Sequence, residues 1–258
     1  MPDQNDQVLQ RELQYHEQLY SGFAQTHFAR PAVRALREHM VERILRVTGV
    51  GRGSRVLSMG CGIGDTELLL APHVGEVVGV DLSPAAIRQA QEDARRLGVS
   101  NAHFVNGTMA DVGRQAFDAA IAIFFLHHLS DSALAAFPAE IGAVIREGGA
   151  FYSLDPSDQR LSGKVGRVLF PGLMKKYQTE DERELNSEST ARLFVGSWTE
   201  VRPGTYDFGS SPLAGLLPGW RTGYRVARRL DDFLLAIPML RRAGSNFEVI
   251  AKGPRKGS

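Results

Sequence analysis

The sequence predicts an α/β protein with a doubly wound, Rossmann-like sheet of about seven strands. The sheet is expected to be mostly parallel with an antiparallel C-terminal strand, and helices should cover both faces. Apolar strand-like runs alternate with helical patterns over residues 54–155, which is typical of a parallel sheet. The run 117–125 is almost wholly apolar, as expected for a central strand covered on both sides. The apolar run that starts at residue 55 breaks at three glycines and resumes as a helical pattern.

The elements follow one another with clear boundary signals. Pro31 suits a first helical position, and apolar residues then recur at helical spacing up to Gly49. A valine-rich strand ends at Asp81, and Ser83 and Pro84 fit the N-cap and first residue of the next helix. The elements expected after the glycines are a strand at 76–80, a helix at 84–97, strands at 103–105 and 117–125, a helix at 130–145 and a strand at 150–154.

The alternation loosens in the C-terminal part. Helices are expected at 186–194 and 224–237, and strands at 200–208 and 246–252. One stripe of the second helix carries Val226, Leu230, Phe233 and Ile237, with arginines around it. We expect this stripe to face the core and the arginines to be solvated. The alternative is that the segment holds a lipophilic or anionic substrate, or contacts a membrane surface.

Length and composition restrict the class of protein. With 258 residues and 43% hydrophobic content, the chain is long enough for one large domain. We expect a helical N-terminal lid over residues 1–50, a ligand-binding core over 51–157, and the rest of the sheet with substrate-recognition insertions over 158–258. The formal net charge of +1 does not favour nucleic acid as the main partner.

Compartment and metal content are also constrained. The single cysteine, Cys61, excludes an intramolecular disulfide and fits a reducing compartment. The N-terminus does not resemble a signal peptide, and no apolar run approaches the roughly 18 residues of a membrane span. A cytoplasmic protein is therefore expected. No paired Cys or His spacing indicates a metal site, so no metal is expected.

The three glycines indicate a ligand site. Gly60, Gly62 and Gly64 allow a sharp turn against which a nucleotide-like cofactor can lie, although a plain strand-to-helix turn would use similar residues. Their spacing is G-x-G-x-G, not the G-x-G-x-x-G of dinucleotide sites, which argues against an NAD-linked dehydrogenase. Asp81, about 20 residues further on, is placed to accept hydrogen bonds from ribose hydroxyls. The alternative is an ordinary acid at a helix N-terminus.

These segments together resemble class I S-adenosylmethionine (SAM) dependent methyltransferases. The resemblance rests on residues 56–64, 77–83, 117–131 and the turn 145–150, in the order of the family's motifs. It is nearest to the branch of small-molecule and quinone-biosynthesis methyltransferases. Two positions depart from the family pattern: Ser58 stands where the family usually has an acid near the SAM amino group, and Thr108 replaces a frequent aspartate.

The resemblance implies a role for individual residues. Gly60 and Gly62 would approach the methionine part of SAM, and Cys61 between them is also counted as a cofactor-binding residue. Asp81 would bind the ribose, and the other cofactor contacts implied are Leu82 against adenine, Thr108 and Met109 beside adenine, and Ile123 and Phe124 from the fourth strand.

Candidates for the reaction itself follow the fourth and fifth strands. His127 and His128 come at the ligand end of the fourth strand, where one of them would serve as general base if the nucleophile must lose a proton. The alternative is that both pack or cap the next helix. Candidate substrate or lid contacts are His16, Tyr20, Tyr152 and Asp155.

The sequence therefore predicts methyl transfer from SAM to a small acceptor, for which lipophilic and aromatic compounds are options. The attacking atom, O, N or C, stays open, as does the oligomeric state. The segment after the fourth strand has no Asn-Pro-Pro-Tyr or Asp-Pro-Pro-Tyr sequence, which disfavours a nucleic acid base as acceptor. The alternative functions are a non-methylating SAM-fold protein that binds or regulates, and an enzyme that uses SAM for another type of reaction.

Overall fold

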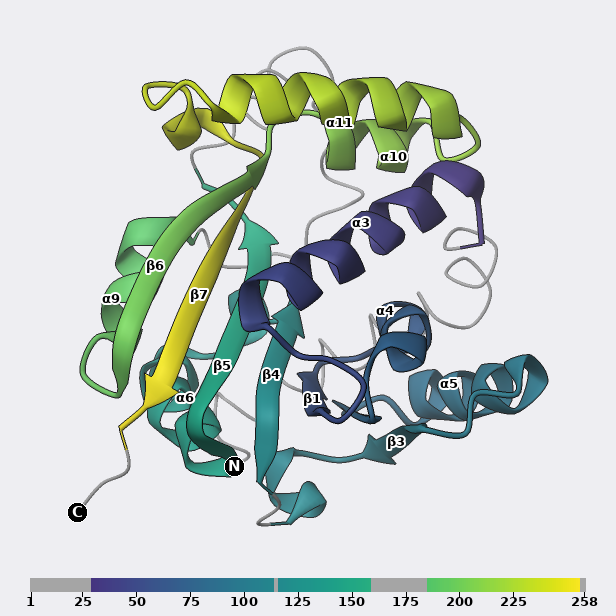
Figure 1. Ribbon diagram of the computed structural model, residues 1–258, viewed down its shortest axis with the longest axis vertical. Coiled ribbons are helices and arrows are strands. Elements are labelled where there is room, and N and C mark those ends of the chain that lie inside the picture. The colour runs from purple at the N-terminus through teal and green to yellow at the C-terminus, as the bar shows by residue number, and fades with distance from the viewer. Residues whose placement is uncertain (1–28, 114–115, 159–184, 256–258) are drawn as a thin grey trace, which may run out of the picture.

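A single seven-stranded sheet organises the computed structural model, which describes residues 29–113, 116–158 and 185–255 (Figure 1). The strand order is β3-β2-β1-β4-β5-β7-β6. Strands β1 to β5 pair in parallel, and β7 is antiparallel to both β5 and β6. The strands are β1 (Arg55–Met59), β2 (Glu76–Asp81), β3 (Ala102–Asn106), β4 (Phe117–Ile123), β5 (Ile145–Pro156), β6 (Trp198–Asp207) and β7 (Asn246–Pro254). The predicted fold class is confirmed.

Helices cover both faces of the sheet, and each face has its own hydrophobic core. One core joins the sheet to α3 (Pro31–Thr48), α4 (Asp65–Leu70), α5 (Pro84–Leu97), α10 (Ser210–Leu216) and α11 (Arg221–Leu235). The other joins it to α6 (Asp131–Val144) and α9 (Ser187–Phe194). Figure 1 shows α3 in front of the sheet with α6 and α9 behind it. Short 3-10 helices are η1 (Ala71–His73), η2 (Met109–Val112), η3 (Leu126–His128) and η4 (Arg241–Ala243).

Local sequence signals account for most of the boundaries. Ser83 Oγ accepts a hydrogen bond from the backbone of Ala86 and caps α5, which ends at Gly98 in the left-handed conformation. Strand β5 begins five residues before the expected start at residue 150. The reason is that Gly148 and Gly149 lie within β5, where the register against β4 shifts, and do not form a turn before it.

The orientation of α11 corrects the sequence-based expectation. Its apolar stripe, expected to face the core, is exposed, and the side that is buried carries Tyr224, Arg228 and Asp231. The Asp231 carboxylate accepts hydrogen bonds from the backbone of Gly209 and Ser210 at the start of α10. The Arg228 guanidinium donates to the backbone carbonyl of Tyr206, whereas Tyr224 Oη and Arg228 Nε are buried without a hydrogen-bond partner in the structure, so the inward polar groups are only partly satisfied. No helix among the described residues is long and apolar enough to cross a membrane.

Candidate functional site

The glycine loop between β1 and α4 begins the candidate site at the carboxyl end of the sheet. Gly60, Gly62 and Gly64 have φ angles of 65°, 53° and 74°, a region that favours glycine. The backbone of Cys61 donates a hydrogen bond to Val80 O, 3.1 Å away, which holds the loop against β2. A Cβ atom at Gly60 would lie 2.5 Å from the ring of a neighbouring phenylalanine. The sequence requirement for glycine is therefore both conformational and steric.

Asp81 connects the glycine loop to the start of α5. Its Oδ2 accepts a hydrogen bond from Gly62 N at 2.8 Å, and its Oδ1 accepts one from Ser83 N at 2.9 Å. The Asn106 amide donates to the carbonyls of Asp81 and Leu82, which fixes the end of β2 against β3. The structure thus brings the predicted ribose-binding acid to the loop, and a carboxylate oxygen can accept further hydrogen bonds.

A buried glutamate lies beside Ser58, the position where the resembling family has an acid. Ser58 Oγ donates to Glu67 Oε1 at 2.6 Å, and Glu67 is only 2% exposed. The other oxygen, Oε2, is buried without a hydrogen-bond partner in the structure. Burial raises the pKa of Glu67 to about 7, and the hydrogen bond from Ser58 partly opposes the rise. A carboxyl group from α4 therefore lies next to Ser58 on β1.

An acidic side chain also lies next to Thr108, the second position that departs from the family pattern. Thr108 N donates to Asp111 Oδ2 at 2.7 Å, and Thr108 Oγ1 donates to the same oxygen at 3.0 Å. These hydrogen bonds, the backbone one first, lower the pKa of Asp111. A Cβ atom at Gly107 would collide with this carboxylate, so the acid sits directly beside the loop that follows β3. Met109 starts the 3-10 helix that Thr108 caps.

The end of β4 carries an unusual backbone conformation. Phe124 has a φ of 56°, and it is the only non-glycine residue with a positive φ among those described. Its backbone donates to Leu154 O at 2.7 Å, and Ile123 before it is buried. The guanidinium of Arg37, from α3, lies 5.8 Å from the centroid of the Phe124 ring and pairs with Asp65 at 2.7 Å. Arg37 was missed by the sequence analysis because nothing distinguishes it from other arginines of an amphipathic helix.

His127 and Asp155 meet between the ends of β4 and β5. The distance from His127 Nδ1 to Asp155 Oδ1 is 2.9 Å, and His127 N donates to the same oxygen at 3.3 Å. Both side chains are buried, and the rings of His127 and His128 are 3.9 Å apart between centroids. The structure therefore pairs a predicted base with a predicted substrate contact. Their catalytic roles stay predictions.

Of the other predicted substrate contacts, Tyr152 is the one that lies among the described residues. Tyr152 is completely buried, and its hydroxyl donates to Glu248 Oε2 at 3.2 Å. Burial, followed by the charge of Glu248, raises the pKa of Tyr152 well above its usual value. His16 and Tyr20 lie outside the described residues. Leu82, the predicted adenine contact, is exposed after β2.

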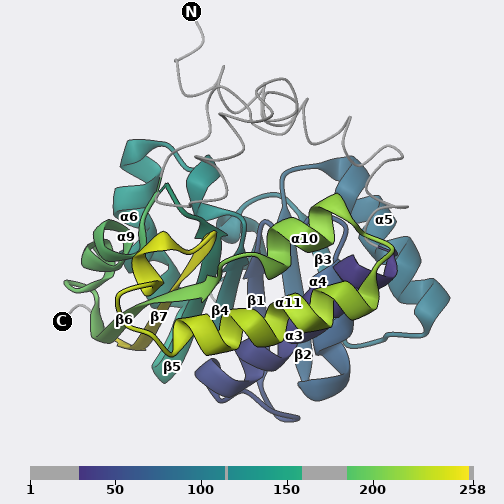
Figure 2. The ribbon, with the colours of Figure 1, turned by 90° about the horizontal axis from the view of Figure 1, so that it is seen from above.

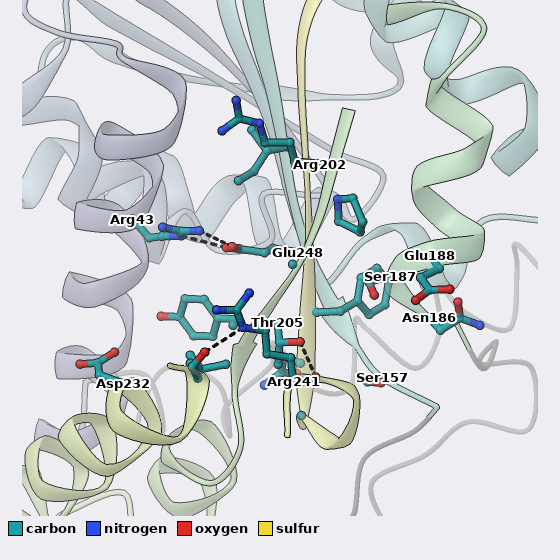
Figure 3. Close-up of a pocket in the computed structure, with 18 of the residues that line it drawn as sticks. Arg43, Ser157, Asn186, Ser187, Glu188, Arg202, Thr205, Asp232, Arg241 and Glu248 are labelled. Atoms are coloured by element: carbon teal, nitrogen blue, oxygen red, sulfur yellow. Dashed lines mark hydrogen bonds and ion pairs between the residues drawn. The ribbon is translucent and has the colours of Figure 1, made fainter. Parts of the chain in front are cut away.

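A second region, an arginine-rich pocket of about 840 Å³, lies where α3 and α11 meet β6 and β7 (Figure 3). None of the predicted cofactor residues lines it. Arg43 forms an ion pair with the buried Glu248, and His39 Nδ1 is 2.6 Å from the Tyr206 hydroxyl. Burial, and then the charge of Arg228, lowers the pKa of His39 to about 4, so this imidazole is neutral at pH 7.

Positive charge exceeds negative charge around this pocket. Its charged side chains are those of Arg43, Arg46, Arg202, Arg228, Arg241, Glu188, Asp232 and Glu248. Such a lining suits a ligand with an anionic group. The sequence analysis missed the pocket because its residues come from segments far apart in the chain. Among the described residues, no group of three His, Cys, Asp or Glu is arranged to hold a metal ion.

Comparison with known proteins agrees with this geometry. Residues 56–149 match the family model described as "Methyltransferase domain". The chain is 44% identical over 84 residues to the 23S rRNA (uracil(1939)-C(5))-methyltransferase RlmD of Xylella fastidiosa, which covers 33% of this chain and 18% of that protein. It is 33% identical over 119 residues to the uncharacterized methyltransferase YcgJ of Bacillus subtilis, covering 44% and 46% of the two chains. The chain thus spans less than a fifth of the RNA methyltransferase and about half of YcgJ.

Solved structures show the same fold. The N-methyltransferase NodS of Bradyrhizobium japonicum, in complex with S-adenosyl-L-homocysteine, superimposes with a TM-score of 0.59 at 14% identity, covering 94% of this chain and 98% of NodS. The [4+2]-cyclase SpnF gives a TM-score of 0.56 at 17% identity, covering 85% and 81%. Residues 56–149 therefore form a methyltransferase domain, and the strand order gives the chain the fold of SAM-dependent methyltransferases such as NodS.

Proposed function

We propose that the protein transfers a methyl group from SAM to a small acceptor. The observation that carries the proposal is the glycine loop whose Gly62 amide is held by Asp81, the acid at the end of the next strand. That arrangement leaves a glycine surface for the cofactor and a carboxylate for the ribose. The cofactor contacts that the resemblance implies for Gly60, Leu82 and Met109 are part of the same proposal.

The residues at the loop fit a positively charged cofactor. SAM carries a sulfonium and an ammonium group, and Glu67 offers a buried carboxylate oxygen without a hydrogen-bond partner. We assign to Glu67 the role of the acid that is absent at Ser58. Asp111 takes the corresponding role near Thr108, where its carboxylate lies beside the loop after β3. In this proposal, the acids absent at Ser58 and Thr108 are replaced by Glu67 and Asp111, so the site still carries acidic side chains.

Catalysis by this chain would depend on how the acceptor is positioned and on removal of a proton from its attacking atom. When bound, SAM supplies an activated methyl group, so the protein must mainly hold the acceptor in line with it. Asp155 fixes the ring of His127 through Nδ1. A histidine oriented in this way is suited to accept a proton from an O or N nucleophile, in the manner of other carboxylate-oriented bases.

Several observations support a small molecule as acceptor over RNA. The similarity to RlmD covers only 33% of this chain and 18% of RlmD, and the net charge of +1 is close to zero. The excess of arginine in the pocket between α3 and β6 supports an acceptor with an anionic group, and lipophilic or aromatic character in the rest of the molecule is compatible with it. A cytoplasmic location belongs to the proposal, since the lone cysteine is free and buried.

The test is an incubation with methyl-labelled SAM. The full chain is mixed separately with the small-molecule fraction and the RNA fraction of a bacterial extract, and products are read by mass. We expect label in the small-molecule fraction and formation of S-adenosylhomocysteine. Label found in RNA alone would overturn the choice of acceptor, and the absence of S-adenosylhomocysteine from every fraction would overturn methyl transfer.

A second candidate is an enzyme of this fold that uses the cofactor without transferring its methyl group, or a binding protein. The departures at Ser58 and Thr108 favour it, and SpnF shows that a [4+2]-cyclase can have this fold. The same incubation separates the candidates. A changed small molecule without an added methyl group supports another reaction, and cofactor binding with no changed compound supports a binding protein.

A further inference from the structure

The outward face of α11 is an apolar strip without a partner among the described residues. Val226 is 62% exposed, Leu230 56% and Phe233 67%. These positions are three or four residues apart, so they lie on one side of the helix. Beyond the end of the helix, Met239 is 89% exposed. Large apolar side chains exposed together along one helix mark a surface that contacts another apolar phase.

Basic residues flank the strip. Arg225 and Arg229 are exposed, and no ion pair joins either of them to a carboxylate in the described part of the chain. Helical spacing puts both on one flank of the strip, one turn apart. The strip thus combines phenylalanine, leucine and valine with arginine, which is the pattern of a helix that lies in the interface of a membrane.

The strip is held rigidly by the opposite side of the same helix. The Arg228 guanidinium donates to Tyr206 O at 2.9 Å, and the Asp231 carboxylate accepts from Gly209 and Ser210. In Figure 1, α11 crosses the end of the molecule toward which β4 and β5 point, and Figure 2 shows it on the outside of the fold. The helix therefore presents its apolar strip without having to fold or to leave the protein.

We propose that the outer face of α11 docks on a membrane surface that contains anionic phospholipid. The apolar side chains enter the boundary between headgroups and acyl chains, and Arg225 and Arg229 contact the lipid phosphates. Leu235 and Pro238, at the C-terminal end of this segment, line the arginine-rich pocket, so docking would hold that pocket beside the lipid. The proposal does not depend on methyl transfer.

The test is co-sedimentation of the full chain with vesicles. We expect binding to phosphatidylcholine vesicles that contain about one third phosphatidylserine, and weaker binding to phosphatidylcholine alone. The double variant Leu230→Ser and Phe233→Ser should lower the partition coefficient by about tenfold or more. The double variant Arg225→Gln and Arg229→Gln should lower binding to the anionic vesicles and reduce its dependence on salt.

Matched controls use α5, on another part of the surface. Leu97→Ser removes an apolar side chain that is 55% exposed, and Arg88→Gln with Arg95→Gln removes two exposed arginines. These variants should bind vesicles as the wild type does, and equal melting temperatures would show that all variants fold. The proposal is overturned if the wild type does not bind anionic vesicles, or if the α11 variants bind as well as the controls. It is also overturned if sedimentation shows a dimer that the Phe233 variant converts to a monomer, because a second copy would then cover the strip.

Discussion

Replacing Glu67 with glutamine should change how the stability of the protein depends on pH. Glu67 is buried beneath the glycine loop, and burial raises its pKa from an ordinary 4.5 to about 7. A carboxyl whose pKa is higher in the folded state than in the unfolded state stabilises the fold below the unfolded pKa, and this contribution is lost as pH rises through the folded pKa. The loss between pH 5 and pH 8 amounts to about 2 to 3 kcal/mol.

Glu67→Gln keeps the size of the side chain and an oxygen that can accept from Ser58 Oγ. It removes the titrating group, so the variant should gain stability relative to the wild type as pH rises. The assay is urea unfolding at pH 5, 6, 7 and 8, which yields the difference in unfolding free energy between the two proteins. Glu92→Gln, at an exposed glutamate of α5, is the control and should show no such trend.

A cofactor with positive charge adds a second consequence. Binding it near Glu67 favours the charged carboxylate, so binding should release a proton and should tighten between pH 6 and pH 8. Calorimetry in buffers of different ionisation enthalpy measures the proton release, which should vanish in Glu67→Gln. If the difference in unfolding free energy is the same at pH 5 and pH 8, the reasoning about the buried carboxyl is refuted. If stability behaves as expected but SAM binding releases no proton, the assignment of Glu67 to the cofactor is wrong.

Other substitutions test separate parts of the structure. Arg43→Met should lower the free energy of unfolding by about 3 kcal/mol or more, since it leaves the buried Glu248 without its cation. Arg202→Met, at an exposed ion pair, should lower it by less than about 1 kcal/mol. Equal losses in urea unfolding would contradict the difference in burial. Gly60→Ala should weaken cofactor binding and lower stability by at least about 1 kcal/mol, because the residue has a positive φ and a ring lies beside it; unchanged binding and melting temperature would show that the loop adapts. His127→Asn should lower the single-turnover rate of methyl transfer by about 100-fold with cofactor affinity kept within about twofold; an unchanged rate would exclude His127 as the base.

The fold and the cofactor loop could be predicted because their signals are local. The three glycines, the interval to Asp81 and the apolar run of β4 each lie within a few adjacent residues. Boundaries set by turns were less certain, as Gly148 shows by lying within β5. The buried acid beside Ser58 could not be found in this way. Glu67 follows Asp65 in the first turn of a short helix, where acids are common, and its burial depends on the contact with Ser58 across the loop.

The orientation of α11 was predicted incorrectly for a physical reason. Periodicity shows that a helix has an apolar side, and the core is usually the place where that side is buried. Here the inward face is polar, and Arg228 and Asp231 form hydrogen bonds with the backbone around β6 and α10. Such partners belong to distant segments and leave no mark in the helix's own sequence. The arginine-rich pocket was missed for the same reason.

The loop closed by Asp81 is the proposed cofactor site. The most direct measurement is calorimetric titration of S-adenosylhomocysteine into the wild type and into Asp81→Ala, with Asp93→Ala on α5 as control. We predict saturable binding by the wild type and the control, and affinity that is lower by about tenfold or more in Asp81→Ala, since hydrogen bonds to a charged group are lost. Wild-type protein that binds neither S-adenosylhomocysteine nor SAM, or Asp81→Ala that binds as tightly as the wild type, would contradict the account.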